Sequence, residues 1–424
     1  MRENEPAAER LNWTLDQWLH WQESLNPKRI DLGLERVSAV ARALGLIPAQ
    51  ATTLTIAGTN GKGSSAVLAA EIYRAAGYRV GCYTSPHLLH YNERVVIEGH
   101  EAAGVDLCAA FRAVDAARNG APLTYFEFGT LAALWLFRRA MVDVQVLEVG
   151  LGGRLDAVNI VDADCAVVTE IGLDHRDWLG PDRESIGREK AGVYRRGHPA
   201  ICVDPDPPHS LLQVGQAADL RRIGYDFAFE RDANSWTWHG RSERYSGLPL
   251  PHIPGAIQLR NAAGVLAAVE ALQPLRKVTR TALEAGLVHA RIRGRIERHA
   301  DLLLDVGHNA EAVDVLVDYL QAQAEAPRAL VLGMMRDKPV EAVARRLASV
   351  FHDVYAAGLP APRGLSAAQL AVRLQGAGMQ VRACVDVAAA LAMARRQAPA
   401  AYGPIVVCGS FKTVAAALEN GKST

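Results

Sequence analysis

The sequence has no excess of charge of either sign. Its 424 residues include 46 Lys and Arg and 46 Asp and Glu, so the formal net charge is zero. A chain without an overall basic field offers no broad surface to the nucleic-acid backbone or to an anionic membrane. We therefore expect neither nucleic acid nor a membrane among its partners. Any small anionic ligand must be held by a local cluster of residues.

Long apolar segments and paired cysteine motifs are also missing. No apolar run approaches the ~20 residues that cross a bilayer, and the charged start, Met1 to Pro6, is unlike a secretory signal. The six cysteines show no C-x-x-C spacing, and most lie in apolar, strand-like runs. This pattern indicates buried free thiols in a reducing cytoplasm rather than disulfides or zinc. The cysteines are Cys82, Cys108, Cys165, Cys202, Cys384 and Cys408.

What the chain has instead is an alternation of β-rich apolar runs with helical stretches. Strand followed by helix, repeated, predicts an α/β fold with a large, mostly parallel sheet covered on both faces. The proline-rich segment 204–254 breaks the alternation and is expected to be an antiparallel excursion. The expected strands lie at 52–57, 79–84, 142–149 and 164–171, and the expected helices at 64–76, 125–140, 258–272 and 279–287.

A second strand–helix series begins after Arg295. It predicts a smaller, Rossmann-like α/β domain at 297–424, following a larger domain at 1–296. A helix is expected from Ala310, and the strands of this domain at 302–306, 329–333, 353–357 and 405–408.

The first candidate site is the glycine-rich run Thr55-Ile-Ala-Gly-Thr-Asn-Gly-Lys-Gly-Ser-Ser65. In the spacing G-x-x-x-x-G-K-[ST] the first glycine would stand at position 56, but the chain has Ile56 there and glycine at 58. The run still lies between a buried strand and a helix, which is the context that a phosphate site requires. Glycines let the backbone approach phosphates, the helix start adds partial positive charge, and Lys62 and Ser64 can contact phosphate or its magnesium. The alternative is a plain strand-to-helix turn with a capping serine.

Three further runs carry candidate polar residues. Glu148 ends a strand before Gly150, where a carboxylate is either a Mg²⁺ ligand or the partner of a lysine or arginine. Asp174 and His175 follow another strand and are metal or base residues, or structural ones. Lys190 binds no cation when protonated and can do so only as a carbamate. From residue chemistry alone, we expect Lys190 to be a surface residue in an ion pair with Glu184 or Glu189.

Together these motifs resemble the Mur ligase superfamily, and within it the bacterial bifunctional dihydrofolate synthase/folylpolyglutamate synthase family. The variant loop G-T-N-G-K-G-S is the form that this family uses, which accounts for the unusual spacing. The resemblance covers nearly the whole chain, and several motifs occur in the family's order. They are 30–36, 85–88, 123–127, 148–159, 174–180, 188–192, 305–309 and 408–412.

The resemblance implies roles for individual residues. Ser85 and Glu148 would bind one Mg²⁺, and Glu148, His175 and carbamylated Lys190 a second. Lys62, His175, Lys190 and His308 would serve catalysis, with His308 near the glutamate or the γ-phosphate. The ATP site would comprise Thr59, Asn60, Gly61, Lys62, Gly63, Ser64, Asn261, Arg295 and Asp305. The pteroate site would comprise Arg29, Ile30, Asp31, Leu32, Ser85, Thr124, Arg154, Leu155 and Asp156. Because a Pro-Gly-Arg triplet is common in the family where this chain has Arg293-Gly-Arg295, Arg293 and Arg295 are alternatives for one role.

The implied reaction is an ATP-dependent ligation. A pteroate carboxylate would attack the γ-phosphate of ATP to give an acyl phosphate, and the amino group of L-glutamate would then form the amide. The implied partners are ATP, L-glutamate, dihydropteroate and tetrahydrofolates, with two Mg²⁺ ions, and we expect a monomer. Alternatives are an enzyme that only extends folate tails, a nucleotide-dependent binding module or regulatory ATPase, and a cell-wall ligase.

Overall fold

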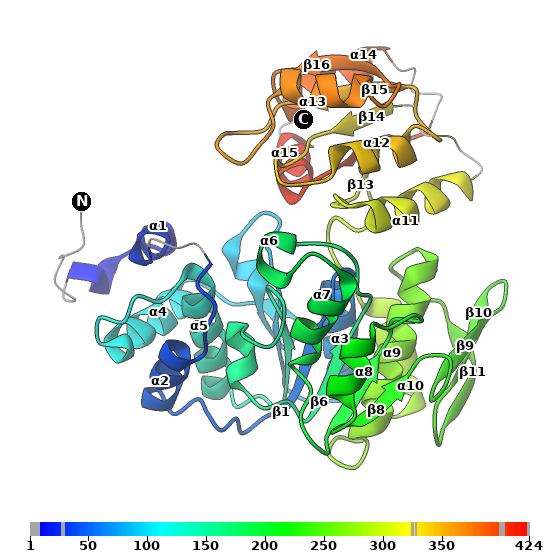
Figure 1. The fold of residues 1–424 in the computed structure, drawn as a ribbon. Helices are drawn as coiled ribbons and strands as arrows, with labels where there is room; N and C mark the ends of the chain where they lie inside the picture. The colour runs from blue at the N-terminus through cyan, green and yellow to red at the C-terminus, as the bar shows by residue number, and fades with distance from the viewer. Residues whose placement is uncertain (1–8, 27–29, 324–325, 327–328, 398–402, 422–424) are drawn as a thin grey trace. The chain divides into compact units, whose positions relative to one another are not determined.

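The computed structural model describes residues 9–26, 30–323, 326, 329–397 and 403–421, in two compact units (Figure 1). The first unit contains residues up to His252 and Leu259–Arg291. The second contains Ile253–Gln258 and the chain from Ile292 onward. The structural division therefore falls five residues before the expected boundary at 296/297 and adds a short segment, Ile253–Gln258, to the second unit.

The first unit is built on one large sheet. Its described strands run in the order β4-β3-β2-β5-β1-β6-β7-β8. Neighbours from β2 to β8 pair in parallel, whereas β3 pairs antiparallel with both β2 and β4. This confirms the prediction of a large, mostly parallel sheet. The strands are β1 (Thr52–Ala57), β2 (Val80–Tyr83), β3 (Val95–Ile97), β4 (His100–Glu101), β5 (Val144–Glu148), β6 (Cys165–Val168), β7 (Pro199–Cys202) and β8 (Asp219–Arg222).

Helices cover both faces of this sheet (Figure 1). Successive side chains of a strand point to opposite faces. In β6, Cys165 and Val167 pack with α3, α9 and α10, whereas Ala166 and Val168 pack with α2, α4, α5 and α7. A strand that is buried on both faces has a continuous run of apolar residues, and this run allowed β6 to be predicted from the sequence. The helices are α1 (Leu15–Leu25), α2 (Glu35–Ala43), α3 (Lys62–Ala75), α4 (Gly104–Arg118), α5 (Tyr125–Arg139), α6 (Arg176–Leu179), α7 (Arg183–Ala191), α8 (His209–Gly215), α9 (Ala256–Leu272) and α10 (Arg280–His289).

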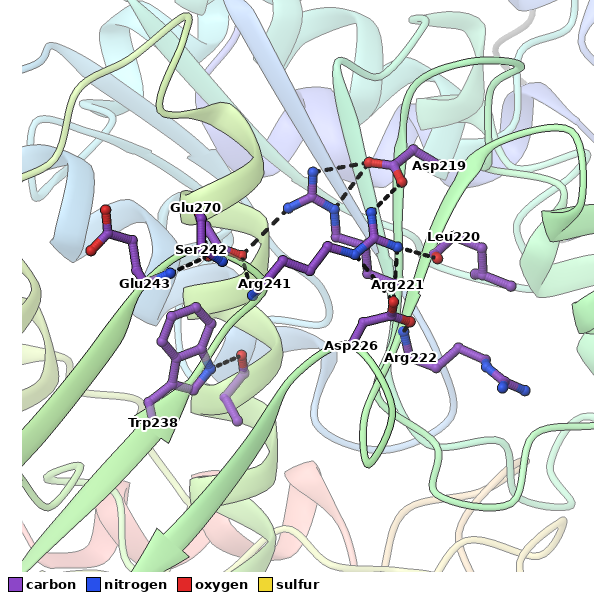
Figure 2. Close-up of polar contacts among 11 residues, drawn as sticks. Asp219, Leu220, Arg221, Arg222, Asp226, Trp238, Arg241, Ser242, Glu243 and Glu270 are labelled. Atoms are coloured by element: carbon purple, nitrogen blue, oxygen red, sulfur yellow. Dashed lines mark hydrogen bonds and ion pairs between the residues drawn. The ribbon is translucent and has the colours of Figure 1, made fainter.

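The antiparallel excursion is shorter than the sequence predicted. Residues 204–227 form α8 and the parallel strand β8 of the main sheet. Only β9 (Ala228–Arg231), β10 (Ser235–His239) and β11 (Arg244–Pro249) pair antiparallel, in a separate sheet. Figure 2 shows how the turn between β10 and β11 is joined to the edge of the main sheet: Arg241 lies 2.6 Å from Asp219, in β8, and 2.9 Å from Asp226. The short charged strand β8 escaped prediction because it lies at the sheet edge and lacks an apolar run.

The second unit has its own sheet, in the order β12-β13-β17-β14-β15-β16. All neighbours pair in parallel except β12 and β13. This confirms the predicted second α/β domain. Its strands are β12 (Glu297–His299), β13 (Leu302–Leu304), β14 (Ala329–Leu332), β15 (Asp353–Ala357), β16 (Gln380–Cys384) and β17 (Ile405–Cys408), and its helices are α11 (Ala310–Gln321), α12 (Val340–Leu347), α13 (Ala367–Gln375), α14 (Val387–Gln397) and α15 (Phe411–Gly421).

Two further predictions concern cysteines and membrane spans. All six cysteines are buried and free, as predicted. Among the helices that the structure describes, none is long and apolar enough to cross a membrane.

Candidate active site

The glycine-rich run forms the connection between β1 and α3. Gly58 has φ +142°, and a Cβ there would lie 1.7 Å from Thr169 Oγ1. Gly61 is the N-cap of α3 with φ +85°, and a Cβ there would lie 2.6 Å from Asn261 Nδ2. Both positions therefore require glycine for conformation and for space. The first backbone N–H groups of α3, from Lys62 onward, lack intrahelical acceptors, which makes this turn an anion-binding geometry.

Two lysine side chains converge on this loop. Lys62 Nζ donates hydrogen bonds to Gly58 O at 3.0 Å and to Thr59 O at 3.1 Å. Lys190 Nζ, from α7, donates to the same Gly58 O at 2.7 Å. One neutral carbonyl thus accepts hydrogen bonds from two lysine amines. The remaining loop residues, Asn60, Gly63 and Ser64, complete the turn, and Ser64 is buried in the first turn of the helix.

The position of Lys190 corrects the expectation from residue chemistry alone. Lys190 is 4% exposed rather than on the surface. Its two expected partners are engaged elsewhere: Glu184 accepts from the backbone N–H groups of His209 and Ser210, and Glu189 pairs with Arg154 at 2.8 Å. Burial, followed by the positive charge of Lys62, holds the pKa of Lys190 well below its usual range. The amine is therefore held toward its neutral form.

Glu148 and Ser85 lie together at the same sheet edge. Glu148 ends β5, which pairs directly with β1, and Ser85 follows β2, which pairs with β5. The backbone N–H of Ser85 donates to Glu148 Oε2 at 2.8 Å, and the Glu148 side chain is buried. Carboxyl ends of adjacent parallel strands form the usual ligand edge of an α/β sheet. The structure thus brings Ser85 and Glu148 together beside the loop strand.

His175 begins α6 from a left-handed conformation with φ +51°. Its side chain is 43% exposed, and Nε2 lies 3.7 Å from Asp174 Oδ2. Asp174 also acts electrostatically on Lys190. The loop that carries His175 therefore extends toward the buried lysine.

The residues expected at the pteroate site fall into two groups. Asp156 is fully buried and accepts from the backbone N–H groups of Leu151 (2.8 Å) and Val158 (3.1 Å). Burial raises its pKa to about 7, against the lowering effects of those bonds and of Lys62. Arg154 is exposed and pairs with Glu189. Leu155 lies between Arg154 and Asp156 in the sequence.

The second group lies around the start of α5. Thr124 caps this helix and donates its hydroxyl to Glu127, which pairs with Arg36 at 2.9 Å. Arg36 also pairs with Asp31 at 2.7 Å, and Ile30 and Leu32 are half-buried on either side of Asp31. Asp31 and Thr124 are therefore linked through Arg36 and Glu127. Arg29 lies outside the described residues.

In the second unit, Asp305 directly follows β13, and Arg295 precedes β12. Asp305 is buried and accepts from the N–H groups of Gly307 (2.7 Å) and Ile296 (3.0 Å). Burial raises its pKa, and the nearby charge of Arg295 opposes the rise. Arg295 also lies over the ring of Phe411, whereas Arg293 is exposed. Of the two alternatives, Arg295 is the one beside Asp305.

His308 lies near the same aromatic ring, with its ring centroid 6.5 Å from that of Phe411. Its Nδ1 lies 2.9 Å from Val306 O. Since a carbonyl only accepts, Nδ1 must carry the proton in this bond, so Nε2 is the acceptor nitrogen of the neutral ring.

The structure adds residues that sequence reasoning did not select. Thr169 is buried and donates its hydroxyl to Asn60 O at 2.7 Å, and Thr59 N donates to Glu170 O at 2.7 Å. These contacts hold the loop from the neighbouring strand β6. The available signal was a polar Thr169-Glu170 pair at the end of an apolar strand.

Comparisons with known proteins agree with this architecture. The family described as "Mur ligase, glutamate ligase domain" matches residues 291–411. A dihydrofolate synthase/folylpolyglutamate synthase of Escherichia coli K12 is 44% identical over 96% of this chain and 95% of its own length. A structure of E. coli FolC in complex with DHPP and ADP superposes with a TM-score of 0.92 at 42% identity, covering 97% of this chain and 99% of that one.

A third comparison is a bifunctional folylpolyglutamate synthase/dihydrofolate synthase with Mn, AMPPNP and L-glutamate bound. It has a TM-score of 0.88 at 42% identity and covers 96% of this chain and 98% of that one. The fold and the loop thus define an ATP-dependent ligase of the Mur ligase type. Within that class, the chain belongs to the dihydrofolate synthase/folylpolyglutamate synthase family.

Proposed function

We propose that this protein joins L-glutamate to dihydropteroate, giving dihydrofolate, and to the tails of tetrahydrofolates, using ATP. The observation that carries the proposal is the loop after β1, where Lys62 and Lys190 share the carbonyl of Gly58. Lys62 brings a positive charge to this loop, and the phosphates of a nucleotide can bind to it. The relatives named for both activities span nearly the whole chain, which supports the choice of acceptors.

The chemistry proceeds in two steps. An oxygen of the substrate carboxylate attacks the γ-phosphorus of ATP, the bond to the bridging oxygen breaks, and ADP leaves with an acyl phosphate remaining. The amino nitrogen of glutamate then attacks the carbonyl carbon and loses a proton, and inorganic phosphate leaves. Because oxide is a poor leaving group and phosphate is a good one, ATP makes the carboxylate reactive. Lys62 and the N–H groups of Gly61, Lys62, Gly63 and Ser64 hold and neutralise the phosphates, with Thr59 and Asn60 shaping the loop.

The residues at the main sheet edge fit a hard divalent cation. Ser85 offers a hydroxyl and Glu148 a buried carboxylate, and oxygen donors of this kind suit Mg²⁺. Two bound Mg²⁺ ions would neutralise charge on the transferring phosphoryl group. Glu148 and Ser85 hold one ion in this proposal, and Glu148, His175 and Lys190 hold the other.

Lys190 takes part as a carbamate. A protonated lysine has only donors, so it cannot bind a cation. Its buried amine is held toward the neutral form, which is the form that reacts with CO₂. The neighbouring Lys62 would then stabilise the negative carbamate that forms.

Further roles follow for the remaining expected residues. Asn261, packed against Gly61, contacts the adenine region, and Arg295 and Asp305 contribute to ATP binding. His308 acts near the glutamate or the γ-phosphate. The pteroate lies against Ile30, Asp31, Leu32, Ser85, Thr124, Arg154, Leu155 and Asp156, with Arg29 next to them in sequence. In this proposal residues 1–296 bind pteroate and most of the ATP, and residues 297–424 bind glutamate and add Asp305 to the ATP site.

Two further features belong to the proposal. The assigned residues need no contribution from a second copy of the chain, and we propose a monomer. Six buried, free thiols support a reducing compartment, the cytoplasm.

The test is ADP release by the purified protein with ATP, Mg²⁺ and L-glutamate. We expect release that requires glutamate with dihydropteroate and, separately, with tetrahydrofolate. If ADP is released with glutamate and tetrahydrofolate but not with glutamate and dihydropteroate, the protein is an enzyme that only extends folate tails. Calorimetric titration with glutamate, in the presence of a non-hydrolysable ATP analogue and folate, tests the remaining alternative. Absence of glutamate binding there would favour a nucleotide-dependent binding module.

A further inference from the structure

An ion pair outside the assigned site holds the segment against which the phosphate loop rests. Arg260 Nη2, from α9, lies 3.3 Å from Glu170 Oε1, directly after β6, and each side chain is 22% exposed. Arg260 Nε and Glu170 Oε2 are buried atoms without a hydrogen-bond partner in the described parts of the chain. Buried charge is costly unless it is paired. The two side chains therefore depend on each other.

Glu170 belongs to the short segment 169–172 that fixes the loop backbone. Glu170 O accepts from Thr59 N at 2.7 Å. On either side of Glu170, Thr169 Oγ1 donates to Asn60 O at 2.7 Å, and Gly172 N donates to Thr59 Oγ1 at 3.0 Å. Two consecutive loop residues, Thr59 and Asn60, are thus held by main-chain and hydroxyl groups of this one segment.

These contacts decide which backbone N–H groups remain for a ligand. In a trans peptide the C=O and the N–H point in opposite directions. Because the carbonyl of Asn60 points at Thr169, the N–H of Gly61 in the same peptide points away from β6. Because the N–H of Thr59 points at Glu170, the carbonyl of Gly58 points the other way, toward Lys62 and Lys190. A displaced segment 169–172 would rotate these peptides and misdirect the donors that bind phosphate.

We propose that Arg260 and Glu170 are positioning residues that keep the phosphate loop in its nucleotide-binding shape. They act through segment 169–172 and do not touch the nucleotide themselves. Arg260 neighbours Asn261, which packs against Gly61, so two consecutive residues of α9 both contribute to the surroundings of the loop. This inference rests on the proposed function, because it assumes that the loop binds nucleotide.

The chain supplies a matched control on the same helix. Arg221 Nη1, from β8, lies 3.5 Å from Glu270 Oε2 of α9, and both side chains are mostly buried. Figure 2 shows this pair among the polar contacts of the small antiparallel sheet, which include no residue of the phosphate loop. Like Arg260–Glu170, it is an Arg–Glu pair that joins α9 to the main sheet. A variant here weakens the attachment of α9 without reaching segment 169–172.

The experiment is calorimetric titration of ADP into the full-length protein, with melting temperatures measured in parallel. We expect Arg260→Gln and Glu170→Gln each to raise the Kd for ADP about tenfold, which corresponds to about 1.4 kcal/mol. The double variant should bind ADP no more weakly than either single one, because the two residues act as a unit. Arg260→Lys should recover part of the affinity. Arg221→Gln should lower the melting temperature and leave the Kd for ADP unchanged.

Several outcomes would overturn the inference. One is unchanged ADP affinity in folded Arg260→Gln protein. Another is equal weakening by Arg221→Gln, which would show a general effect of α9 attachment. If neither Arg260→Gln nor Glu170→Gln folds, the pair determines folding and not loop shape, and the inference is also overturned. A wild-type protein that binds no ADP would instead refute the proposed function, so the two failures are distinguishable.

Discussion

The carboxyl edges of the two sheets are built in opposite ways. After β1, two lysine amines converge on the single carbonyl of Gly58. After β13, a single carboxylate, Asp305, accepts from two backbone N–H groups and lies near the charge of Arg295. The first edge brings the positive charge of Lys62 to the loop, whereas at the second edge the charge of Arg295 faces the carboxyl group of Asp305. We infer that most of the phosphate-binding energy resides in the first unit and that the second unit contributes orientation.

The largest effect that would test this comparison is expected from Lys62→Ala. Removing a charge aimed at a developing phosphate charge should lower kcat by about 10²–10³-fold. The variant should remain folded, because the two hydrogen bonds from the lysine to loop carbonyls each have a net value of about 1 kcal/mol. The measurement is glutamate-dependent ADP release together with circular dichroism. Lys277→Ala, at an exposed position of the same unit, is the control, and a wild-type rate in Lys62→Ala would remove Lys62 from phosphate binding.

A comparable loss of kcat is expected from Lys190→Ala, but in this variant a small carboxylic acid should restore part of the activity. If Lys190 acts as a carbamate, a short carboxylic acid such as acetate can occupy the vacated space and supply the missing oxygen donors. We expect acetate or formate to restore part of the rate to Lys190→Ala and none to Lys62→Ala. Rescue of both variants would point to a general salt effect. Full activity of Lys190→Ala without acetate or formate would show that Lys190 has only a structural role.

The two lysines also show what the sequence could and could not predict. The loop 58–64 is contiguous, so its glycines, its lysine and the following helix specify its geometry locally. Lys190 lies in the charged run Arg188-Glu-Lys190, where local pattern predicts exposure; only the tertiary fold carries its amine to Gly58. The resemblance to a family assigned Lys190 a role that residue chemistry alone did not.

The same limit applies to the fold. Strands buried on both faces, such as β5 and β6, were predicted to within a few residues because they are continuous apolar runs. Helices α1, α2 and α4, and the charged edge strand β8, are missing from the prediction. The pair Arg260–Glu170 escaped as well, since its members are ninety residues apart and neither belongs to a recognisable motif.

A smaller and more selective effect is expected at the edge of the second sheet. His308→Ala should lower kcat/KM for glutamate by about ten- to a hundredfold, corresponding to about 1.4–2.7 kcal/mol. The affinity for ADP should remain close to that of the wild type, because the loop after β1 is unchanged. The measurements are steady-state kinetics with glutamate varied and calorimetric titration of ADP. His352→Ala, an exposed histidine of the same unit, is the control.

A further titration with a non-hydrolysable ATP analogue, which carries the γ-phosphate that ADP lacks, decides between the two positions proposed for His308. A loss confined to kcat/KM for glutamate would place it near the amino acid. A loss of affinity for the ATP analogue but not for ADP would place it near the γ-phosphate. A large loss of ADP affinity would contradict the inference that most of the phosphate-binding energy resides in the first unit.

The least direct test of the comparison is a change in the pH dependence of stability caused by Asp156. Its pKa is about 7 in the folded protein, because burial outweighs its backbone hydrogen bonds, and about 3.9 in an unfolded chain. Between these values the native state holds a proton that the unfolded state has lost, so stability falls as pH rises from about 4 to about 7. A single titrating group changes the free energy of unfolding by at most about 1.4 kcal/mol per pH unit. Denaturant titrations of the wild type and Asp156→Asn at pH 5 and pH 8 measure it.

Asp156→Asn should be the less stable protein, since its amide must face N–H donors that the carboxylate accepts from. Its deficit relative to the wild type should narrow from pH 5 to pH 8, because only the wild type loses the contribution of this proton. The control is Asp206→Asn, at an exposed position; its free energy of unfolding should change with pH as that of the wild type does. If the free energy of unfolding of Asp156→Asn also changes with pH as in the wild type, the raised pKa of Asp156 is contradicted. In a Lys62→Ala background, the pH range over which the stability falls should extend to higher pH, because Lys62 lowers the pKa of Asp156. That extension would show directly that the positive charge at the first edge reaches the expected pteroate loop.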